Sequence, residues 1–147
     1  MIRVVCVGRA RGPLAEASAE YEERLARTCK FELHELREEG TPSLSPREAM
    51  LRERAQRRIP ADAYVSLLAA DGQALDSIGL ARFIAERRMS RRDLCFVVGG
   101  PFGVELERAD HRLSLGRLTL PHQLARVVLL EQLYRAHKII AREPYHH

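Results

Sequence analysis

Leu94 to His122 read LCFVVGGPFGVELERADHRLSLGRLTLPH, and this stretch decides the fold. It opens with an apolar run, Leu94 to Val98, that ends in two glycines, a pattern typical of a buried strand leading into a tight loop. Near its end a short apolar strand is followed by Gly116 and by a loop that Pro121 closes. Glycine allows backbone to approach a ligand closely. Because ligands of open α/β sheets bind outside the carboxyl ends of the strands, we expect the two loops to form the rim of one pocket.

The rest of the chain alternates between strand and helix patterns. We expect strands at residues 2–7, 31–36, 63–70, 94–98 and 113–115, and helices at 14–28, 45–59, 77–88, 104–110 and 122–140. This alternation predicts an α/β fold, a parallel sheet with helices on both faces. Strict alternation at 31–36 predicts an edge strand. We expect Asp71 and Gly72 to turn the chain, Ser77 to cap a helix, and residues 37–44 to form a mobile loop.

The last expected helix, 122–140, is apolar around most of its circumference. A helix of this kind is buried on two sides. In a chain of this size one side faces the sheet, and we expect the other to contact a second subunit. Glu131 and Arg135 lie four residues apart on this helix and can form an ion pair.

Length and composition are those of a globular protein of one domain: 147 residues, 46% hydrophobic and 30% charged. The net charge is +4, and all but two of the 24 basic residues, Lys30 and Lys138, are arginine. Arginine suits phosphate contacts, although genomic base composition explains the excess equally well. No apolar run is long enough to span a membrane. Three cysteines without a CxxC spacing favour a reducing compartment, so we expect the cytoplasm.

The motifs present and absent narrow the chemistry. The histidines form neither an HExxH motif nor a paired spacing with cysteine, so no metal site is expected. A GxSxG elbow, a P-loop lysine and a complete GxGxxG are also missing. The candidate catalytic groups that remain are His122, Arg135, Tyr145 and His146. This small set of groups is suited to an enzyme that transfers a group from a reactive cofactor, because the protein then mainly positions the reactants.

Four motifs in a fixed order resemble those of a known family. They are Gly99-Gly100-Pro101-x-Gly103, Leu118-Thr119-Leu120-Pro121-His122, Leu133-Tyr134-Arg135-Ala136 and Pro144-Tyr145-His146. Together, and from end to end of the chain, they resemble the SPOUT methyltransferases, and within them the ribosomal large-subunit methyltransferase H family. The sequence departs from the family at Phe102, where glutamate is usual, and at His147, where arginine is common.

The resemblance implies that residues 1–147 form a single methyltransferase domain whose C-terminal part is threaded into a trefoil knot, a rare exception to the unknotted-chain rule. It implies a homodimer built on the last helix, with S-adenosylmethionine as cofactor. The implied reaction is methylation of N3 of a pseudouridine in 23S rRNA on the assembled ribosome, and neither a membrane nor DNA is expected as partner. Carried over by position, the cofactor contacts are Leu68, Gly99, Gly100, Leu115, Gly116, Arg117, Leu118, Thr119 and Leu120.

The catalytic roles are hypotheses with structural alternatives. We expect Arg135 to stabilise the deprotonated base or a phosphate, and Tyr145 and His146 to position the base, with His146 taking the proton. Alternatively, Arg135 only pairs with Glu131, His146 belongs to a frayed tail, and His122 only packs at a helix start. Arginines expected to contact RNA phosphates are Arg9, Arg11, Arg87, Arg88, Arg91 and Arg92.

Three other functions stay open at this level. The first is a non-catalytic module that binds RNA or the ribosome, which needs the arginines but not the glycine loops. The second is a flavodoxin-like small-molecule or signalling domain, which predicts a monomer. The third is a SPOUT enzyme that acts on tRNA.

Overall fold

The computed structural model describes residues 1–37, 54–100 and 106–146. Its elements are β1 (Ile2–Val7), α1 (Gly12–Thr28), β2 (Phe31–Leu36), β3 (Tyr64–Ala74), α3 (Ser77–Met89), β4 (Leu94–Val98), β5 (His111–Ser114) and α4 (His122–Ala141). Residues 54–58 are also helical. The expected loop at 37–44 and most of the expected helix at 45–59 lie outside the described residues.

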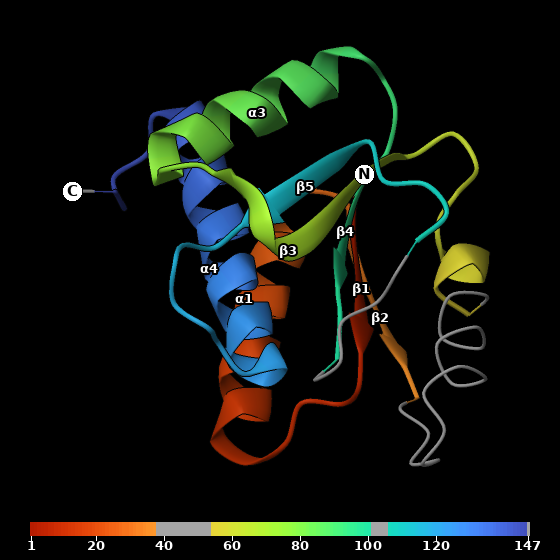
Figure 1. Cartoon of the computed structure of the whole chain (residues 1–147). Helices are drawn as coiled ribbons and strands as arrows, with labels where there is room; N and C mark the ends of the chain where they lie inside the picture. Colours follow the sequence, from red (N-terminus) through yellow and green to blue (C-terminus); the bar gives the residue numbers. More distant parts are fainter. Residues whose placement is uncertain (38–53, 101–105, 147) are drawn as a thin grey trace.

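The strands form one parallel sheet in the order β2-β1-β4-β3-β5 (Figure 1). β1 and β4 lie inside the sheet, and all of β4 is buried, as its unbroken apolar run predicts. β2 lies at an edge, which confirms the prediction made from its alternating pattern. The parallel α/β fold expected from the sequence is therefore confirmed.

Helices cover both faces of this sheet, as predicted. On one face α4 packs between α1 and α3, and their apolar side chains meet Val4, Phe96 and Val98. On the other face the segment 54–58 contributes Ala55 to a second core, which contains Val97. None of the helices in the described part of the chain is both long and apolar enough to cross a membrane.

Strand β3 is longer than predicted, because Asp71 and Gly72 do not turn the chain. β3 continues to Ala74 beside β5, with an irregularity in the register between Leu68 and Gln73 that places both opposite Leu113. Residues 69–72 therefore bulge between two paired stretches, and bulges of this kind often lie beside functional sites. A Cβ atom added to Gly72 would lie 2.7 Å from backbone atoms of β5, so no side chain fits there.

Three further local predictions, the cap at Ser77, the helix at 104–110 and the strand at 113–115, differ from the structure at the described residues. Asp76, and not Ser77, caps α3, because its carboxylate accepts a hydrogen bond of 2.6 Å from the Gly79 N–H. Residues 106–110 are not helical. The Asp110 carboxylate instead accepts a hydrogen bond from the Val65 N–H at 2.8 Å, which ties the chain to β3 immediately before β5 begins. β5 accordingly spans His111–Ser114 and not 113–115.

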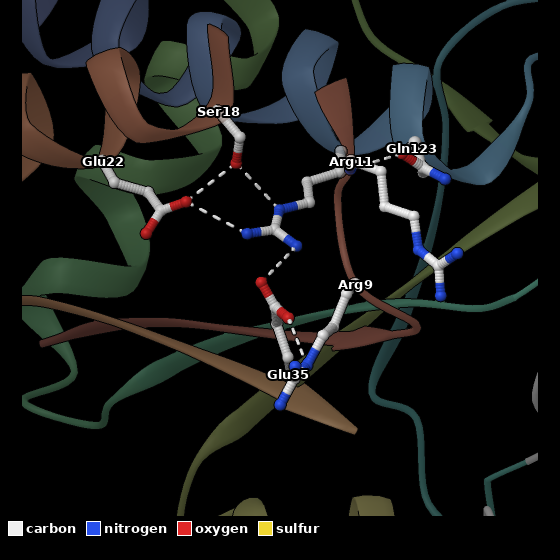
Figure 2. A network of polar contacts seen from close by, with 7 residues as sticks. Arg9, Arg11, Ser18, Glu22, Glu35 and Gln123 are labelled. Atoms are coloured by element: carbon white, nitrogen blue, oxygen red, sulfur yellow. Dashed lines mark hydrogen bonds and ion pairs between the residues drawn. The ribbon is translucent and has the colours of Figure 1, made fainter. Parts of the chain in front are cut away.

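A buried ion network fixes α4 to α1 and β2. Arg126 of α4 is 4% exposed, and its guanidinium donates hydrogen bonds to the Ser18 hydroxyl at 2.9 Å and to the carboxylates of Glu22 and Glu35 at 3.1 and 3.0 Å. Figure 2 shows Ser18, Glu22 and Glu35 converging on this guanidinium from α1 and β2. A charge so deeply buried requires partners of this kind. The network therefore holds the first half of α4 in place.

Candidate functional site

A cavity of about 610 Å³ opens beside the bulge of β3 and the carboxyl ends of β4 and β5, where α4 begins. We call it the glycine-loop cavity. Its lining comprises Leu68 to Ala70, Val98 to Gly100, residues 113–122 other than Arg117, and Ala125. The start of the first loop, Gly99 and Gly100, and the loop after β5 thus meet around one space, as predicted, while residues 101–103 lie outside the described residues. Its position agrees with the general location of ligand sites in open α/β sheets.

Eight of the nine residues expected to contact a cofactor line this cavity. Leu68 comes from β3, Gly99 and Gly100 follow β4, and the remainder follow β5. Arg117 is the exception, because it is exposed and is not part of the lining. These eight residues therefore lie together around one cavity, and the identity of their ligand is a separate question.

Gly116 and Ser114 give the loop after β5 its shape. Gly116 has φ +117°, a backbone conformation that residues other than glycine rarely adopt. The Ser114 hydroxyl donates a hydrogen bond to the Gly116 carbonyl at 3.0 Å and accepts one from its N–H at 3.2 Å. These contacts hold the loop in the bent conformation that forms one wall of the cavity.

Among the described residues, the lining of the glycine-loop cavity is mostly apolar and contains neither lysine nor arginine. Its volume falls within the range of about 300–1,000 Å³ typical of small-molecule and cofactor sites. Ala69 and Ala70, which sequence analysis did not identify, reach the lining because the β3 bulge carries them there. In the sequence, Asp71-Gly72 indicated a turn at this point, whereas the structure has a bulge within β3.

A second polar group forms where the C-terminal tail returns to α4. Glu131 Oε1 accepts hydrogen bonds from Arg135 Nη2 at 2.6 Å and from the Tyr145 hydroxyl at 3.2 Å. Arg135 Nη1 lies 3.3 Å from His146 Nδ1. We call these four residues the tail cluster. The expected pair of Glu131 and Arg135 is confirmed, and the tail contacts α4 as far as His146.

Charge and burial define the protonation states in the tail cluster. The hydrogen bonds that Arg135 donates to Glu131 raise the pKa of Arg135, which therefore stays cationic. Burial raises the pKa of the Tyr145 phenol, and its hydrogen bonds add to the effect, so the hydroxyl keeps its proton and donates. The Arg135 guanidinium also lies 4.8 Å from the centre of the Tyr145 ring. Glu131 contacts both Arg135 and Tyr145, whereas the sequence indicated it only as a partner of Arg135.

The tail cluster and the glycine-loop cavity are separate within one chain. Both involve α4, but Ala125 lines the cavity and Arg135 follows ten residues later, about 15 Å along the helix. His122 lines the cavity and takes no part in the cluster. The structure therefore groups Arg135, Tyr145 and His146 with one another, and not with the expected cofactor contacts.

A parallel α/β sheet with a ligand-sized cavity at the carboxyl ends of its strands defines a class of proteins that bind a cofactor or another small molecule. A family model described as "Predicted SPOUT methyltransferase" matches residues 1–146. The chain belongs to the SPOUT methyltransferase family, which confirms the resemblance seen in its motifs.

Curated relatives extend over nearly the whole chain. It is 46% identical over 155 residues to a protein of Rubrobacter xylanophilus, and the alignment covers 97% of this chain and 96% of that protein. It is 43% identical over 154 residues to a protein of Gemmatimonas aurantiaca, and this alignment covers 99% of this chain and 98% of that protein. Both relatives are named Ribosomal RNA large subunit methyltransferase H.

Proposed function

We propose that the protein methylates 23S rRNA, at N3 of a pseudouridine on the assembled ribosome. The observation that carries this proposal is that two loops with family motifs, at Gly99 and at residues 115–120, surround one cavity. The names of the relatives, aligned over nearly full length, support ribosomal RNA as the substrate. We further propose that residues 1–147 act as a single domain, in the cytoplasm, where ribosomes are found.

S-adenosylmethionine is the proposed methyl donor. The cavity has the volume of a cofactor site, and its described lining residues, which include neither lysine nor arginine, suit a ligand that carries a positive sulfonium. When bound, this cofactor supplies an electrophilic methyl group. The residues proposed to hold it are the eight that line the cavity: Leu68, Gly99, Gly100, Leu115, Gly116, Leu118, Thr119 and Leu120.

The tail cluster is the proposed catalytic group. The imide N3–H of the target base must lose its proton, and a fixed cation favours the resulting anion. Arg135 suits this role because Glu131 holds its guanidinium through Nε and Nη2, while Nη1 points to His146. Tyr145 is a hydroxyl donor that can position the base.

His146 is the proposed acceptor of the N3 proton. Arginine can only donate, so its contact with Nδ1 requires that nitrogen to be unprotonated in the neutral ring. Nδ1 must therefore move away from Arg135 before it accepts a proton, because two cations at 3.3 Å repel each other. The exposed position of His146 permits this movement.

We propose that the enzyme acts as a homodimer built on α4. Within one chain the tail cluster lies about 15 Å along α4 from the cavity, too far for direct transfer. Leu124, Val127 and Val128 of α4 remain only half-buried, and Leu118 at the cavity is 83% exposed. A second copy that covers these apolar side chains would bring its tail cluster near the cavity of the first.

A trefoil knot in the C-terminal part is also proposed. β5 forms the edge of the sheet next to β3, whereas α4 packs against both α1 and α3. The residues that connect β5 to α4, 115–121 without Arg117, line the cavity together with residues of β3 and residues that follow β4, so the chain returns across this end of the sheet. This return path supports the threading that the family resemblance implies.

Methyl transfer from labelled S-adenosylmethionine tests the proposal. Deproteinised 23S rRNA, separate ribosomal subunits, whole ribosomes and tRNA are the substrates, and the labelled nucleotide is mapped. We expect label at one pseudouridine of 23S rRNA in whole ribosomes. Label confined to tRNA would reassign the substrate. No label anywhere, together with no heat of cofactor binding, would favour a non-catalytic RNA-binding module.

His146→Ala tests the catalytic assignment. We expect it to lower the rate of methyl transfer far more than the affinity for the cofactor, because His146 does not line the cavity. The matched control is His34→Ala, on the edge strand β2, which should leave both quantities unchanged. Equal losses of rate and cofactor affinity in His146→Ala would refute its role.

A further inference from the structure

A second, smaller pocket lies at the opposite end of the sheet from the glycine-loop cavity. Its volume is about 250 Å³, and Ile2 and Leu94, at the starts of β1 and β4, form part of its lining. Cys29 adds a further apolar contact. The five residues of β4 separate the two sites by about 17 Å. Because the strands are parallel, this pocket lies at their amino ends.

Five cationic side chains surround this space, which we call the basic pocket. They are Lys30, Arg87, Arg88, Arg91 and Arg92. Within the described ranges only Arg87 has a carboxylate partner, Glu86, at 3.9 Å. The neighbouring Asp93 is already paired with the amino group of Met1 at 3.2 Å. The basic pocket therefore carries a surplus of positive charge.

Helix α3 alone does not account for this surplus. Cations at a helix C-terminus are favoured by a dipole equivalent to about half a negative charge. That is enough to favour one or two arginines, and α3 already has Arg87 and Arg88 in its last turn. Arg91 follows with φ +56°, an uncommon conformation for a residue with a side chain. It places a further cation beside the same space.

Aromatic side chains and backbone carbonyls hold two of these guanidinium groups in fixed orientations. The guanidinium of Arg87 lies 4.5 Å from the centre of the Tyr64 ring and 5.3 Å from that of Phe83. Arg92 lies 5.8 Å from the Tyr64 ring and donates hydrogen bonds to the carbonyls of Asp62 and Ala63, at 2.6 and 3.0 Å. Planar guanidinium groups held in this way are suited to phosphate oxygens.

We infer that the basic pocket binds a backbone phosphate of the RNA substrate, at a point remote from the nucleotide that is methylated. Its volume is below the range of about 300–1,000 Å³ for sites that enclose a whole ligand. At roughly 30 Å³ for each water, it has room for about eight waters, or one phosphate with some of its hydration. The inference rests on the proposed function, because the phosphate is that of the proposed RNA substrate.

This assignment divides the arginines that the sequence grouped together. Arg9 and Arg11 follow β1 at its carboxyl end, near the glycine-loop cavity, and Arg9 lies 3.8 Å from Glu35 (Figure 2). The other four surround the basic pocket. RNA that touches both groups must extend along the length of the sheet, so binding at the basic pocket contributes affinity without contributing to the chemical step.

The test is the salt dependence of binding to 23S rRNA and to ribosomes, measured with the unaltered protein and with Arg88→Gln/Arg91→Gln. Both side chains are exposed, so the double variant is expected to fold. Loss of two phosphate contacts should reduce the slope of log K against log salt by about 1.4 to 1.8. The charge-matched control, Arg27→Gln/Arg82→Gln, removes two exposed arginines outside the pocket and should keep the slope. Arg88→Lys/Arg91→Lys should also keep most of it.

The outcomes separate this inference from the proposed function. An unchanged slope in the glutamine variant, with methyl transfer to rRNA intact in the unaltered protein, would overturn the basic pocket alone. A reduced slope in a protein that does not methylate rRNA would overturn the proposed function alone. If the glutamine variant instead lost binding to phosphatidylglycerol vesicles and retained its slope for RNA, the pocket would be a lipid site and the inference would be wrong.

Discussion

Arg126→Met tests the ion network that fixes α4 to α1 and β2. The guanidinium of Arg126 is buried and donates hydrogen bonds to Ser18, Glu22 and Glu35. Methionine replaces the apolar stem of the arginine side chain but has no guanidinium group and no charge. The substitution therefore leaves a hydroxyl and two carboxylates facing the position that the cation occupied, with no donor in its place.

The structure gives the size of the expected effect. Removing one partner of a buried ion pair costs about 3–5 kcal/mol of unfolding free energy. The side chains of Glu22 and Glu35 are 31% and 32% exposed, so water can hydrate them once the cation is gone. We therefore expect the low end of that range, about 3 kcal/mol. A loss of this size is a large share of the roughly 5–15 kcal/mol that keeps a domain folded.

Urea unfolding measures this loss, at one fixed protein concentration because the stability of a dimer depends on concentration. With a slope of about 2 kcal/mol per molar urea, the midpoint should fall by about 1.5 M. The control Arg27→Met removes an arginine that pairs with Glu23 on the surface of α1, where both side chains are mostly exposed. It should change stability by less than about 0.5 kcal/mol.

A triple variant separates the unpaired charges from the loss of packing. Arg126→Met combined with Glu22→Gln and Glu35→Gln should recover part of the lost stability, because no buried charge then lacks a partner. The reasoning is refuted if Arg126→Met costs no more than the Arg27→Met control. It is also refuted if the triple variant is less stable than the single one.

Three other changes have defined outcomes. Gly116→Ala should weaken cofactor binding at least tenfold by calorimetry, because its φ of +117° disfavours any side chain, whereas Gly12→Ala, at φ +57° outside the cavity, should leave it unchanged. Gly72→Ala should cost about 2 kcal/mol and lower the melting temperature by about 4–8 °C, since its Cβ would overlap the backbone of β5, and an unchanged melting temperature would contradict that fit. Burial lowers the pKa of both His111 and His137, so the unfolded chain binds protons more readily, and stability should fall as the pH drops below about 6.5. Urea midpoints should show this fall, and His137→Asn should make it shallower.

Much of the architecture could be predicted from local patterns. The unbroken apolar run of β4 and the alternation of β2 determine which strand is central and which lies at an edge. Glycines after β4 and β5 indicated the two loops that share one cavity. These predictions succeed because burial on one or both faces is encoded residue by residue.

Features that depend on distant partners could not be predicted. Asp71-Gly72 has the composition of a turn, but pairing with β5 keeps it within β3. In the same way nothing near Arg126 in the sequence indicates that it is buried, because its partners lie 91 to 108 positions away. The separation of Arg135 from the cavity also depends on how α4 lies along the sheet. No local pattern specifies such contacts, because they arise only when elements pack together.

The position of Cys29 has a practical consequence for work on the basic pocket. Burial raises the pKa of Cys6 and of Cys95 to about 12, so both thiols stay protonated and shielded in the folded chain. Cys29 is only partly buried and lines the basic pocket. Burial also raises the pKa of Cys29, although less than that of the other two, so a maleimide dye added to the native protein should label this thiol slowly and before Cys6 and Cys95. Protection of Cys29 from labelling by bound RNA would report occupancy of the basic pocket, with no engineered cysteine.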